Sequence, residues 1–316
     1  MEKENLIINL DLPAKERWLF LEKYKKEIED LIEYYLADLS EAEFLFDEID
    51  SYKNSIITTE YLEEISSLAS FTKFTENEIL IANLYYDVLK FYFGCTAFAV
   101  ENNGTIFHSR NLDWHTENDL LSKHSRVFDF QKNGKTVFKS VGWVGFIGVL
   151  SGNKPNQFSI TLNAVLSNDS PEIAQPITFL LRDVLTNCNS FSEAEEILKN
   201  TTIICDCLLL LSGTKSDEKI VIERTPKRAE IRKPEKNHIV VTNDYKKLEN
   251  TNFSQNLLQE TSCGRFNKTD ELLNQKNPEN LEDCISILKN PEIQMGITVQ
   301  QMVFNNNTGE ILFEKV

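Results

Sequence analysis

Apolar and polar positions follow different patterns in two parts of the chain. Between residues 14 and 93, apolar side chains recur every three or four positions, which predicts amphipathic helices. Thr75 and Glu78 form a capping box, and the segment after them is apolar nearly all round, as expected of a buried helix. This part of the chain is therefore predicted to be helical, most clearly at "AKERWLFLEKYKKEIEDLIEYYLADL" and "ILIANLYYDVLKFYF".

After Gly94 the apolar positions form short runs separated by turn residues, which predicts β-strands. Asn133-Gly134 suits the type I′ turn of a hairpin. Three successive hairpins are predicted in "CTAFAVENNGTIFHSRN", "RVFDFQKNGKTVFKSV" and "WVGFIGVLSGNKPNQFSITLNAVL". Later strands are predicted at "TIICDCLLLLSG", "KIVIERT", "AEIRK" and "HIVVTND", and a last hairpin at "TVQQMVFNNNTGEILFEKV".

Helical patterns separate the groups of strands, and Ser170 is the predicted N-cap of the first helix. Strands in antiparallel groups with helices between them indicate an α+β fold of two sheets enclosed by helix layers. No proline-rich linker divides the chain, so residues 1–94 are expected to pack on residues 95–316. The four helices are predicted at "SPEIAQPITFLLRDVLTNC", "SFSEAEEILKN", "CGRFNKTDELLNQK" and "NLEDCISILKN".

The charge of the chain argues against some classes of partner. It has 33 basic and 49 acidic residues, a net charge of −16, and residues 1–94 carry −12 of it through 21 acidic and 9 basic residues. Neither nucleic acid nor an anionic membrane surface is therefore an expected partner. No transmembrane run and no secretory signal is recognised, which predicts a cytoplasmic protein. The spacing of the six cysteines resembles no zinc site, and no metal or cofactor is expected.

The stretch around Cys95 is the strongest candidate for chemistry. In a hairpin the returning strand brings Arg110 and Asp113 beside this cysteine. A nucleophilic thiol needs a base, and no histidine is well placed in the sequence to serve. If the chain were cut between Gly94 and Cys95, the new α-amine, which titrates near about pH 8, would be a base on the nucleophile itself. The alternatives are a structural buried cysteine and a surface Arg110–Asp113 ion pair.

The stretch "GCTAFAVENNGTIFHSRNLDW" resembles the region around the catalytic cysteine of the acid ceramidase and N-acylethanolamine-hydrolysing acid amidase family. These are N-terminal-nucleophile hydrolases of the choloylglycine-hydrolase type. The resemblance implies a four-layer αββα sandwich with an added helical amino-terminal segment. It also implies self-cleavage before the cysteine, giving an α chain, Met1–Gly94, and a catalytic β chain, Cys95–Val316. Further similar segments follow in matching order: "NLDLPAKERW", "VFDFQKNGKTVFKSVGWVGFIGVLSGNKPNQFSITLN", "FLLRDVL", "VVTNDY" and "CGR".

The resemblance also implies a role for each matching residue. Cys95 would be the nucleophile and, through its amine, the base, while Arg110 and Asp113 would orient the amine and the substrate. Asn243 would offer its side-chain amide to the oxyanion. Considered one at a time, each of three residues also has a structural explanation. Asn243 would be a turn residue after a strand, Asn163 would cap the end of a strand, and Arg265 would be a solvated helix residue. The remaining matches are Asn163 and the backbone amide of Ala164, which would line the site, and Arg265, which would tie it together.

Several positions depart from the pattern of that family. Ala97 stands where a serine is usual, and Ala164 stands where a glutamate is common, so an acidic pH optimum is not implied. The segment between "TLNAV" and "FLLRDVL" is also shorter than in the animal enzymes. Residues 1–94 contain no cysteine, so the α and β chains could be held together only by packing, which suits a reducing compartment.

The sequence therefore predicts a cysteine amidase that hydrolyses a linear N-acyl amide, such as an N-acylethanolamine or a ceramide, with an apolar acyl chain. Two alternatives remain open. One is an acyltransferase of the penicillin acyl-transfer type, and the other is a catalytically silent binding protein on the same fold. The expected partners are a small lipid-like N-acyl amide and, for the α chain, the β chain of the same precursor.

Overall fold

The computed structural model of the chain describes residues 5–39, 44–88, 93–249 and 257–316. Its strands form two sheets. The strands of the eight-stranded sheet are β1 (Asn5–Asn9), β4 (Ser125–Lys132), β5 (Lys135–Trp143), β6 (Ser151–Lys154), β7 (Phe158–Asn163), β8 (Cys207–Ser212), β9 (Lys219–Arg224) and β10 (Ala229–Arg232), in that spatial order. Those of the five-stranded sheet are, in spatial order, β11 (His238–Val241), β2 (Phe93–Asn102), β3 (Thr105–Trp114), β12 (Thr298–Asn305) and β13 (Ile311–Lys315).

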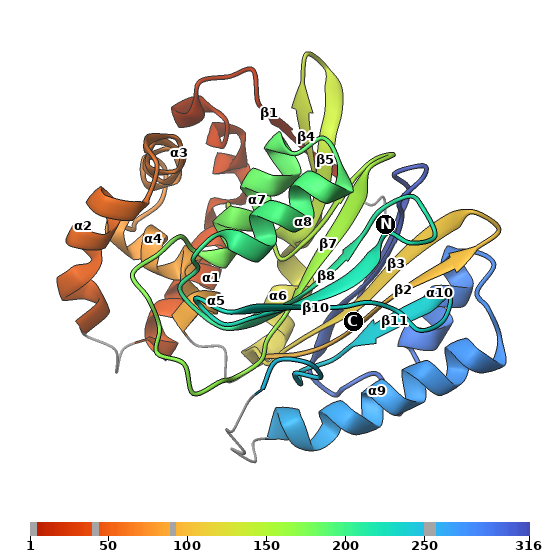
Figure 1. Cartoon of the computed structure of the whole chain (residues 1–316). Coiled ribbons are helices and arrows are strands. Elements are labelled where there is room, and N and C mark those ends of the chain that lie inside the picture. The colour runs from red at the N-terminus through yellow and green to blue at the C-terminus, as the bar shows by residue number, and fades with distance from the viewer. Residues whose placement is uncertain (1–4, 40–43, 89–92, 250–256) are drawn as a thin grey trace.

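The two sheets pack face to face, and helices cover their outer faces (Figure 1). Helices α7 (Ile177–Asn187) and α8 (Phe191–Asn200) lie on the eight-stranded sheet, and α9 (Leu257–Gln275) and α10 (Leu281–Leu288) lie on the five-stranded sheet. The fold is therefore a four-layer αββα sandwich of the α+β class, as predicted. The added amino-terminal helices are α1 (Lys25–Asp38), α2 (Phe44–Ile56), α3 (Thr59–Ala69), α4 (Glu76–Asn83) and α5 (Tyr85–Val88), with 3-10 turns at Ala14–Glu16 and Leu19–Tyr24. A 3-10 turn at Glu117–Asp119 and the short helix α6 (Leu120–His124) follow β3.

The predicted hairpins and one of the two predicted N-caps are present. Asn133 and Gly134 have φ values of 50° and 69°, so both adopt the positive φ that a type I′ turn needs. The same turn geometry at Asn103 and Gly104, with φ of 50° and 79°, joins β2 to β3. The capping box of Thr75 with Glu78 starts α4, and the Ser190 side chain caps α8. Local turn and cap chemistry therefore decides where these elements begin.

The helix predicted from residue 14 was wrong in its first half. Between residues 14 and 24 the chain forms only 3-10 turns, and Trp18, with φ −104° and ψ −2°, interrupts the helical path. The Trp18 ring is fully buried against Phe128 and Phe130, with ring centroids 6.2 Å away in each case. Tertiary packing of this ring overrides the local helical preference. The predicted buried helix divides at Leu84 into α4 and α5, and its last residues, 89–92, lie outside the described part of the chain.

The segment Val144–Leu150 was predicted as a strand but is irregular. Several of its backbone groups bond to other elements: Ile147 N–H donates to Asn83 Oδ1, Val149 N–H donates to the Thr178 carbonyl, and Arg182 binds the Ile147 carbonyl. Such bonds satisfy the main chain without a ladder. The segment thus joins the sheet to helices from both parts of the sequence.

Two further boundaries differ from the prediction. Ser170 does not cap a helix, because α7 begins at Ile177 after Pro176. Residues before a proline disfavour helical geometry, and the predicted helix contained prolines at both 171 and 176. The strand predicted from residue 202 begins only at Cys207.

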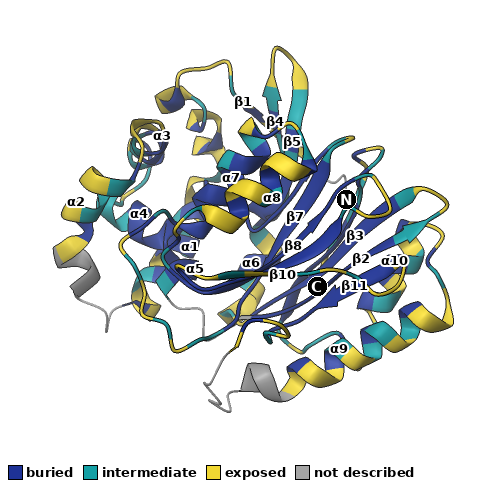
Figure 2. Ribbon diagram, in the orientation of Figure 1, coloured by how far each residue is buried: buried dark blue, intermediate teal, exposed yellow. Residues whose placement is uncertain are grey.

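The space between the sheets is filled by buried side chains. Figure 2 shows the central strands buried along their length, with exposed residues on the outer faces of the helices. A polar contact also joins the sheets: His108 of β3 lies between Ser212 Oγ, at 2.7 Å, and Thr161 Oγ1, at 2.8 Å. One apolar cluster between the sheets contains Ala97, Ala99, Val165, Leu208, Leu210, Val221, Ile239 and Val241.

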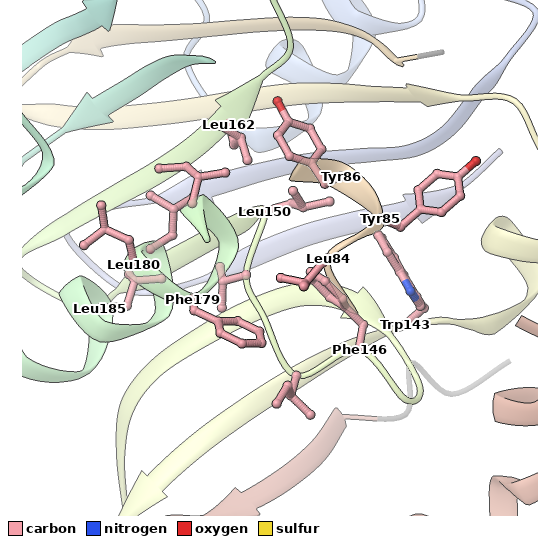
Figure 3. Close-up of a cluster of buried hydrophobic side chains, with 14 of the residues drawn as sticks. Leu84, Tyr85, Tyr86, Trp143, Phe146, Leu150, Leu162, Phe179, Leu180 and Leu185 are labelled. Carbon is pink, nitrogen blue, oxygen red and sulfur yellow. The ribbon is translucent and has the colours of Figure 1, made fainter. Parts of the chain in front are cut away.

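The amino-terminal segment is part of the sandwich and also covers one end of it. Strand β1 pairs in parallel with β4, with Ile8 opposite Phe130, so this segment adds an edge strand to the eight-stranded sheet. Helices α1 to α5 gather beside the sheets at the left of Figure 1. Leu84, Tyr85 and Tyr86 join a buried apolar cluster (Figure 3) whose other labelled members are Trp143, Phe146, Leu150, Leu162, Phe179, Leu180 and Leu185.

Candidate active site

The hairpin of β2 and β3 places the candidate residues in one register. Cys95 lies opposite Leu112, and Ala97 lies opposite Arg110, so the Cys95 and Arg110 side chains share one face as diagonal neighbours. Gly94 lies opposite Asp113, whose side chain points to the other face because side chains alternate along a strand. Parts of a site can therefore approach Cys95 from both faces of the hairpin.

Arg110 binds the thiol from the face that looks toward the eight-stranded sheet. Its Nη2 atom lies 3.1 Å from Cys95 Sγ. The same guanidinium donates to the carbonyls of Leu150, at 2.9 Å, and Leu162, and to Ser151 Oγ. Cys95 and Arg110 are completely buried, which excludes the surface ion pair considered as an alternative. These acceptors fix the guanidinium beside the sulfur in a site without solvent.

Asn243, beyond the end of the neighbouring strand β11, and Arg265, from α9, hold the main chain of Cys95. Cys95 N–H donates to Asn243 Oδ1 at 3.2 Å, and Arg265 Nη1 donates to the Cys95 carbonyl at 2.6 Å. Arg265 also donates to Asn243 Oδ1 at 2.8 Å and to Thr96 Oγ1 at 2.9 Å. The backbone nitrogen, the carbonyl oxygen and the sulfur of Cys95 thus each have a different partner. Arg265 is only 3% exposed, so it is not a solvated helix residue.

Asn243 lies two residues after the end of β11, which pairs with β2, and Arg265 comes from α9. Ser262, one turn before Arg265, accepts a hydrogen bond from Asn243 N–H at 3.0 Å. The Asn243 side-chain amide donates to the Ala164 carbonyl at 2.8 Å. Asn163 donates to the Thr242 carbonyl at 2.9 Å. The structure therefore brings all the predicted site residues into one cluster at the end of the hairpin.

Asp113 lies on the α9 side of the hairpin and is completely buried. Its Oδ1 atom accepts a hydrogen bond of 2.5 Å from Thr298 Oγ1, and its Oδ2 atom lies 4.0 Å from Arg265 Nη1. Burial raises the pKa of Asp113, although Arg265, Thr298 and Arg110 act in the opposite direction. Burial likewise lowers the pKa of Arg265, against the attraction of Asp113. This pair is electrostatically costly in its charged form.

Gly94 lies where the main chain passes very close to its neighbours. A Cβ atom added there would come within 2.8 Å of Met295 Sδ and 3.1 Å of Asp113 Cβ. Only glycine fits this approach without displacement of either side chain. The bond between Gly94 and Cys95 is therefore surrounded closely by the site residues.

Some participants were not found from the sequence. Thr298, Ser262 and Ser151 bind Asp113, Asn243 and Arg110, and nothing in their local sequence distinguishes them from ordinary strand or helix residues. Within the described parts of the chain, no group of His, Cys, Asp and Glu side chains has the arrangement of a metal site. In those parts, no helix has the length and apolar character needed to span a bilayer.

Comparison with known proteins gives a family and a fold. The family model described as acyl-coenzyme A:6-aminopenicillanic acid acyl-transferase matches residues 100–309, a range that includes Arg110, Asn243 and Arg265 and begins after Cys95. An acid ceramidase of Balaenoptera acutorostrata scammoni is 32% identical over 248 residues, which cover 69% of this chain and 62% of the relative. The chain thus matches less than two thirds of the length of that relative.

The N-acylethanolamine-hydrolyzing acid amidase of Caenorhabditis elegans is 29% identical over 245 residues, 69% of this chain and 66% of the relative. A solved structure of the Caenorhabditis elegans N-acylethanolamine-hydrolyzing acid amidase (NAAA) ortholog superimposes with a TM-score of 0.59 at 24% identity. That superposition covers 68% of this chain and 94% of the other. It supports the sandwich fold described above.

Proposed function

Because the chain belongs to the acyl-coenzyme A:6-aminopenicillanic acid acyl-transferase family, we propose that it is a cysteine amidase that hydrolyses a linear N-acyl amide after cutting itself between Gly94 and Cys95. One observation carries this proposal. Separate partners hold the sulfur, nitrogen and carbonyl of Cys95: Arg110 at 3.1 Å, Asn243 at 3.2 Å and Arg265 at 2.6 Å. A cysteine that served only to fill the core would not need such partners.

The first step is self-cleavage. Cys95 Sγ attacks the carbonyl carbon of Gly94, a C–S bond forms, the Gly94–Cys95 C–N bond breaks, and the departing nitrogen takes up the thiol proton. Water then hydrolyses the thioester, leaving a carboxylate on Gly94 and an α-amine on Cys95. Residues 1–94 become the α chain and residues 95–316 the β chain. The complete burial of Cys95 supports this order, because no external amide can reach the sulfur before the chain is cut.

Substrate hydrolysis uses the amine that cleavage creates. The α-amine of Cys95 accepts the thiol proton, the sulfur attacks the acyl carbon, and the proton passes to the leaving amine as the C–N bond breaks. Water attacks the resulting thioester and regenerates the thiol. Asn243 Oδ1, which already accepts from the Cys95 nitrogen, would hold that amine in place. Arg110 holds its guanidinium beside the sulfur during these steps.

The other site residues take supporting roles in this proposal. The Asn243 amide and the backbone N–H of Ala164 would donate to the oxyanion, with the amide leaving its present acceptor, the Ala164 carbonyl. Asn163 fixes the chain at Thr242, next to Asn243. Asp113 and Arg265 together hold the Cys95 main chain from the α9 side.

An apolar acyl group suits the surroundings of the thiol. Cys95 belongs to the same buried apolar cluster as Leu84, Tyr86 and Leu150 (Figure 3). Once cleavage frees the end of the segment that bears Tyr85 and Tyr86, those side chains could yield their place to an acyl chain. The names of the relatives, acid ceramidase and N-acylethanolamine-hydrolyzing acid amidase, support ceramide-like or N-acylethanolamine-like amides as the first substrates to test.

The description of the family model as an acyl-transferase favours a second candidate function. In that reaction an amine, instead of water, takes the acyl group from the Cys95 thioester. The two reactions differ only in the acceptor, so they are separated by adding a nucleophilic amine to the assay. A new amide product that grows with amine concentration would establish acyl transfer.

Intact-mass spectrometry of the purified chain, followed by a substrate panel, tests the proposal. The panel contains N-acylethanolamines, ceramides, N-acyl amino acids and conjugated bile salts. Wild type should appear as two chains divided between residues 94 and 95 and should hydrolyse at least one lipid amide. Cys95→Ala should stay intact and inactive, whereas Cys284→Ala, a change at another buried cysteine, should behave as wild type. An intact wild-type chain with no hydrolysis would instead indicate a silent binding protein.

A further inference from the structure

A buried carboxylate that belongs to no predicted motif binds the chain just after Asn243. Glu223 is the fifth residue of β9 and is completely buried. Its two oxygen atoms accept hydrogen bonds from three consecutive backbone N–H groups: Lys246 at 3.0 and 3.1 Å, Lys247 at 2.8 Å and Leu248 at 2.8 Å. Glu223 thus holds three consecutive residues of the main chain through hydrogen bonds to one side chain.

Neighbouring contacts fix the same segment and balance the charge. Arg232 Nε lies 3.5 Å from Glu223 Oε1, and Arg232 Nη2 donates to the Val240 carbonyl at 2.7 Å, so this arginine links Glu223 to β11. Tyr245 donates its hydroxyl to the Arg224 carbonyl at 2.5 Å. Residues 245–248 are thus bound to the end of β9 by side chains and main chain together.

These contacts join the two sheets at the end where Cys95 lies. Strand β9 belongs to the eight-stranded sheet, whereas Asn243 follows β11 of the five-stranded sheet. Asn243 reaches Cys95 from β11, and the chain after it is held by Glu223 only three residues later. A shift of residues 245–248 would therefore move Asn243 relative to the Cys95 nitrogen.

We propose that Glu223 is a positioning residue for the reaction, which holds Asn243 at the Cys95 nitrogen through the backbone of residues 246–248. This inference rests on the proposed function, because it assigns a catalytic consequence to the Asn243–Cys95 contact. Glu223 itself touches neither the sulfur nor the substrate. Its influence passes through the chain geometry, so its loss should affect catalytic steps more than substrate affinity.

Glu223→Gln is the informative change, because it preserves shape while replacing an acceptor by an NH₂ group that faces backbone donors. Glu218→Gln is a matched control. Glu218 lies just before the other end of β9 and also accepts backbone hydrogen bonds, from Thr214 at 3.0 Å and Lys215 at 3.2 Å. Tyr245→Phe removes the hydrogen bond that joins the same segment to the Arg224 carbonyl. It is the test variant if Glu223→Gln does not fold.

Three measurements are made on the full-length proteins: the rate of self-cleavage, kcat and KM for the best panel substrate, and hydrogen–deuterium exchange of peptides spanning residues 238–249. Glu223→Gln should slow self-cleavage and lower kcat by roughly 10- to 100-fold, the cost of a misplacement near 1 Å, with KM within about twofold. Tyr245→Phe should lower kcat by roughly 2- to 10-fold, the worth of one hydrogen bond. Exchange at residues 242–248 should rise in both variants.

Glu218→Gln should leave all three measurements near wild type. A Glu223→Gln protein with wild-type kcat, or one whose exchange rises at residues 246–248 but not at 242–243, would overturn the positioning role. An inactive wild-type chain would contradict the proposed function instead. In that case unchanged exchange at residues 242–243 would still overturn the inference, because the structural coupling to Asn243 would be absent.

Discussion

Two buried pairs of an arginine and a carboxylate in this protein differ in how closely the opposite charges approach each other. One joins Glu64 of α3 to Arg182 of α7, and the other places Asp113 near Arg265 beside Cys95. Both carboxylates are completely buried, and each arginine is 3% exposed. The first pair is in direct contact, whereas the second is separated by 4.0 Å. The charges of the first pair hold two helices together, whereas those of the second lie beside the proposed reacting atoms of Cys95.

Glu64 and Arg182 both have several hydrogen-bonding partners. Arg182 binds both oxygen atoms of Glu64, one of them at 2.7 Å from Nη2, and donates to the Ile147 carbonyl at 3.0 Å. Arg17 adds a second cation to Glu64 at 3.0 Å. The guanidinium of Arg182 also lies over the ring of Tyr61 at 5.0 Å. Because Glu64 lies before residue 94 and Arg182 after it, this group ties the proposed α chain to the proposed β chain.

The group beside Cys95 leaves part of its bonding capacity unused. Among the described residues, Asp113 Oδ2 has no hydrogen-bond donor, and Arg265 gives its donors to the Cys95 carbonyl and Asn243. Burial raises the pKa of Asp113, so the fold bears a cost when this carboxylate is ionised. Such a cost is typical of functional sites, where the arrangement that suits the chemistry is not the most stable one.

The largest effect is expected from Glu64→Gln. This change leaves Arg182 buried without its matching charge, and breaking one side of a buried pair typically costs about 3–5 kcal/mol. Urea denaturation should therefore show a loss of that size in the free energy of unfolding. The measurement is made in the Cys95→Ala background, where the proposed cleavage cannot divide the chain, and coincident transitions by two probes are required before the free energy is calculated. The exposed neighbour supplies the control, as Glu63→Gln should change the free energy by less than about 0.5 kcal/mol.

Asn243→Ala should have the next largest effect, which is expected on kcat and not on the free energy of unfolding. Loss of its amide removes both the holder of the Cys95 nitrogen and a proposed oxyanion donor, so kcat should fall roughly 100- to 1000-fold. The exposed Asn237, just before β11, provides a control, since Asn237→Ala should keep kcat within about twofold. A kcat for Asn243→Ala within threefold of wild type would remove Asn243 from the proposed mechanism.

The contrast between the two groups also shows what the sequence could predict. The hairpin of residues 95–114 follows from local pattern and turn residues, and its register alone places Arg110 diagonal to Cys95. Asn243 and Arg265 were found only through resemblance, because more than 140 residues separate each from Cys95 and no local rule links them. Glu64 and Arg182 lie in ordinary amphipathic helices, so nothing in the sequence marked their pairing. Contacts of long sequence separation depend on the whole fold.

Asp113→Asn, like Glu64→Gln, replaces a buried carboxylate by an amide. It should change the free energy of unfolding in the opposite direction. Burial raises the pKa of Asp113 above its value in the unfolded chain, so the folded state takes up a proton first as the pH falls. Wild-type stability therefore rises as the pH drops through the raised pKa toward about 4, the unfolded value. Above that raised pKa the ionised carboxylate destabilises the folded chain, a cost that the asparagine variant does not carry.

Asp113→Asn, measured in the Cys95→Ala background, should consequently be at least as stable as its parent at pH 7, and the advantage should shrink as the pH approaches 4. With Cys95 present, the same substitution should lower kcat, because the carboxylate no longer attracts Arg265 at the Cys95 carbonyl. Urea denaturation at several pH values gives the stability difference directly. If Asp113→Asn destabilised the protein at pH 7 as strongly as Glu64→Gln, both carboxylates would be stabilising ion-pair members, and the distinction between the two groups would fail.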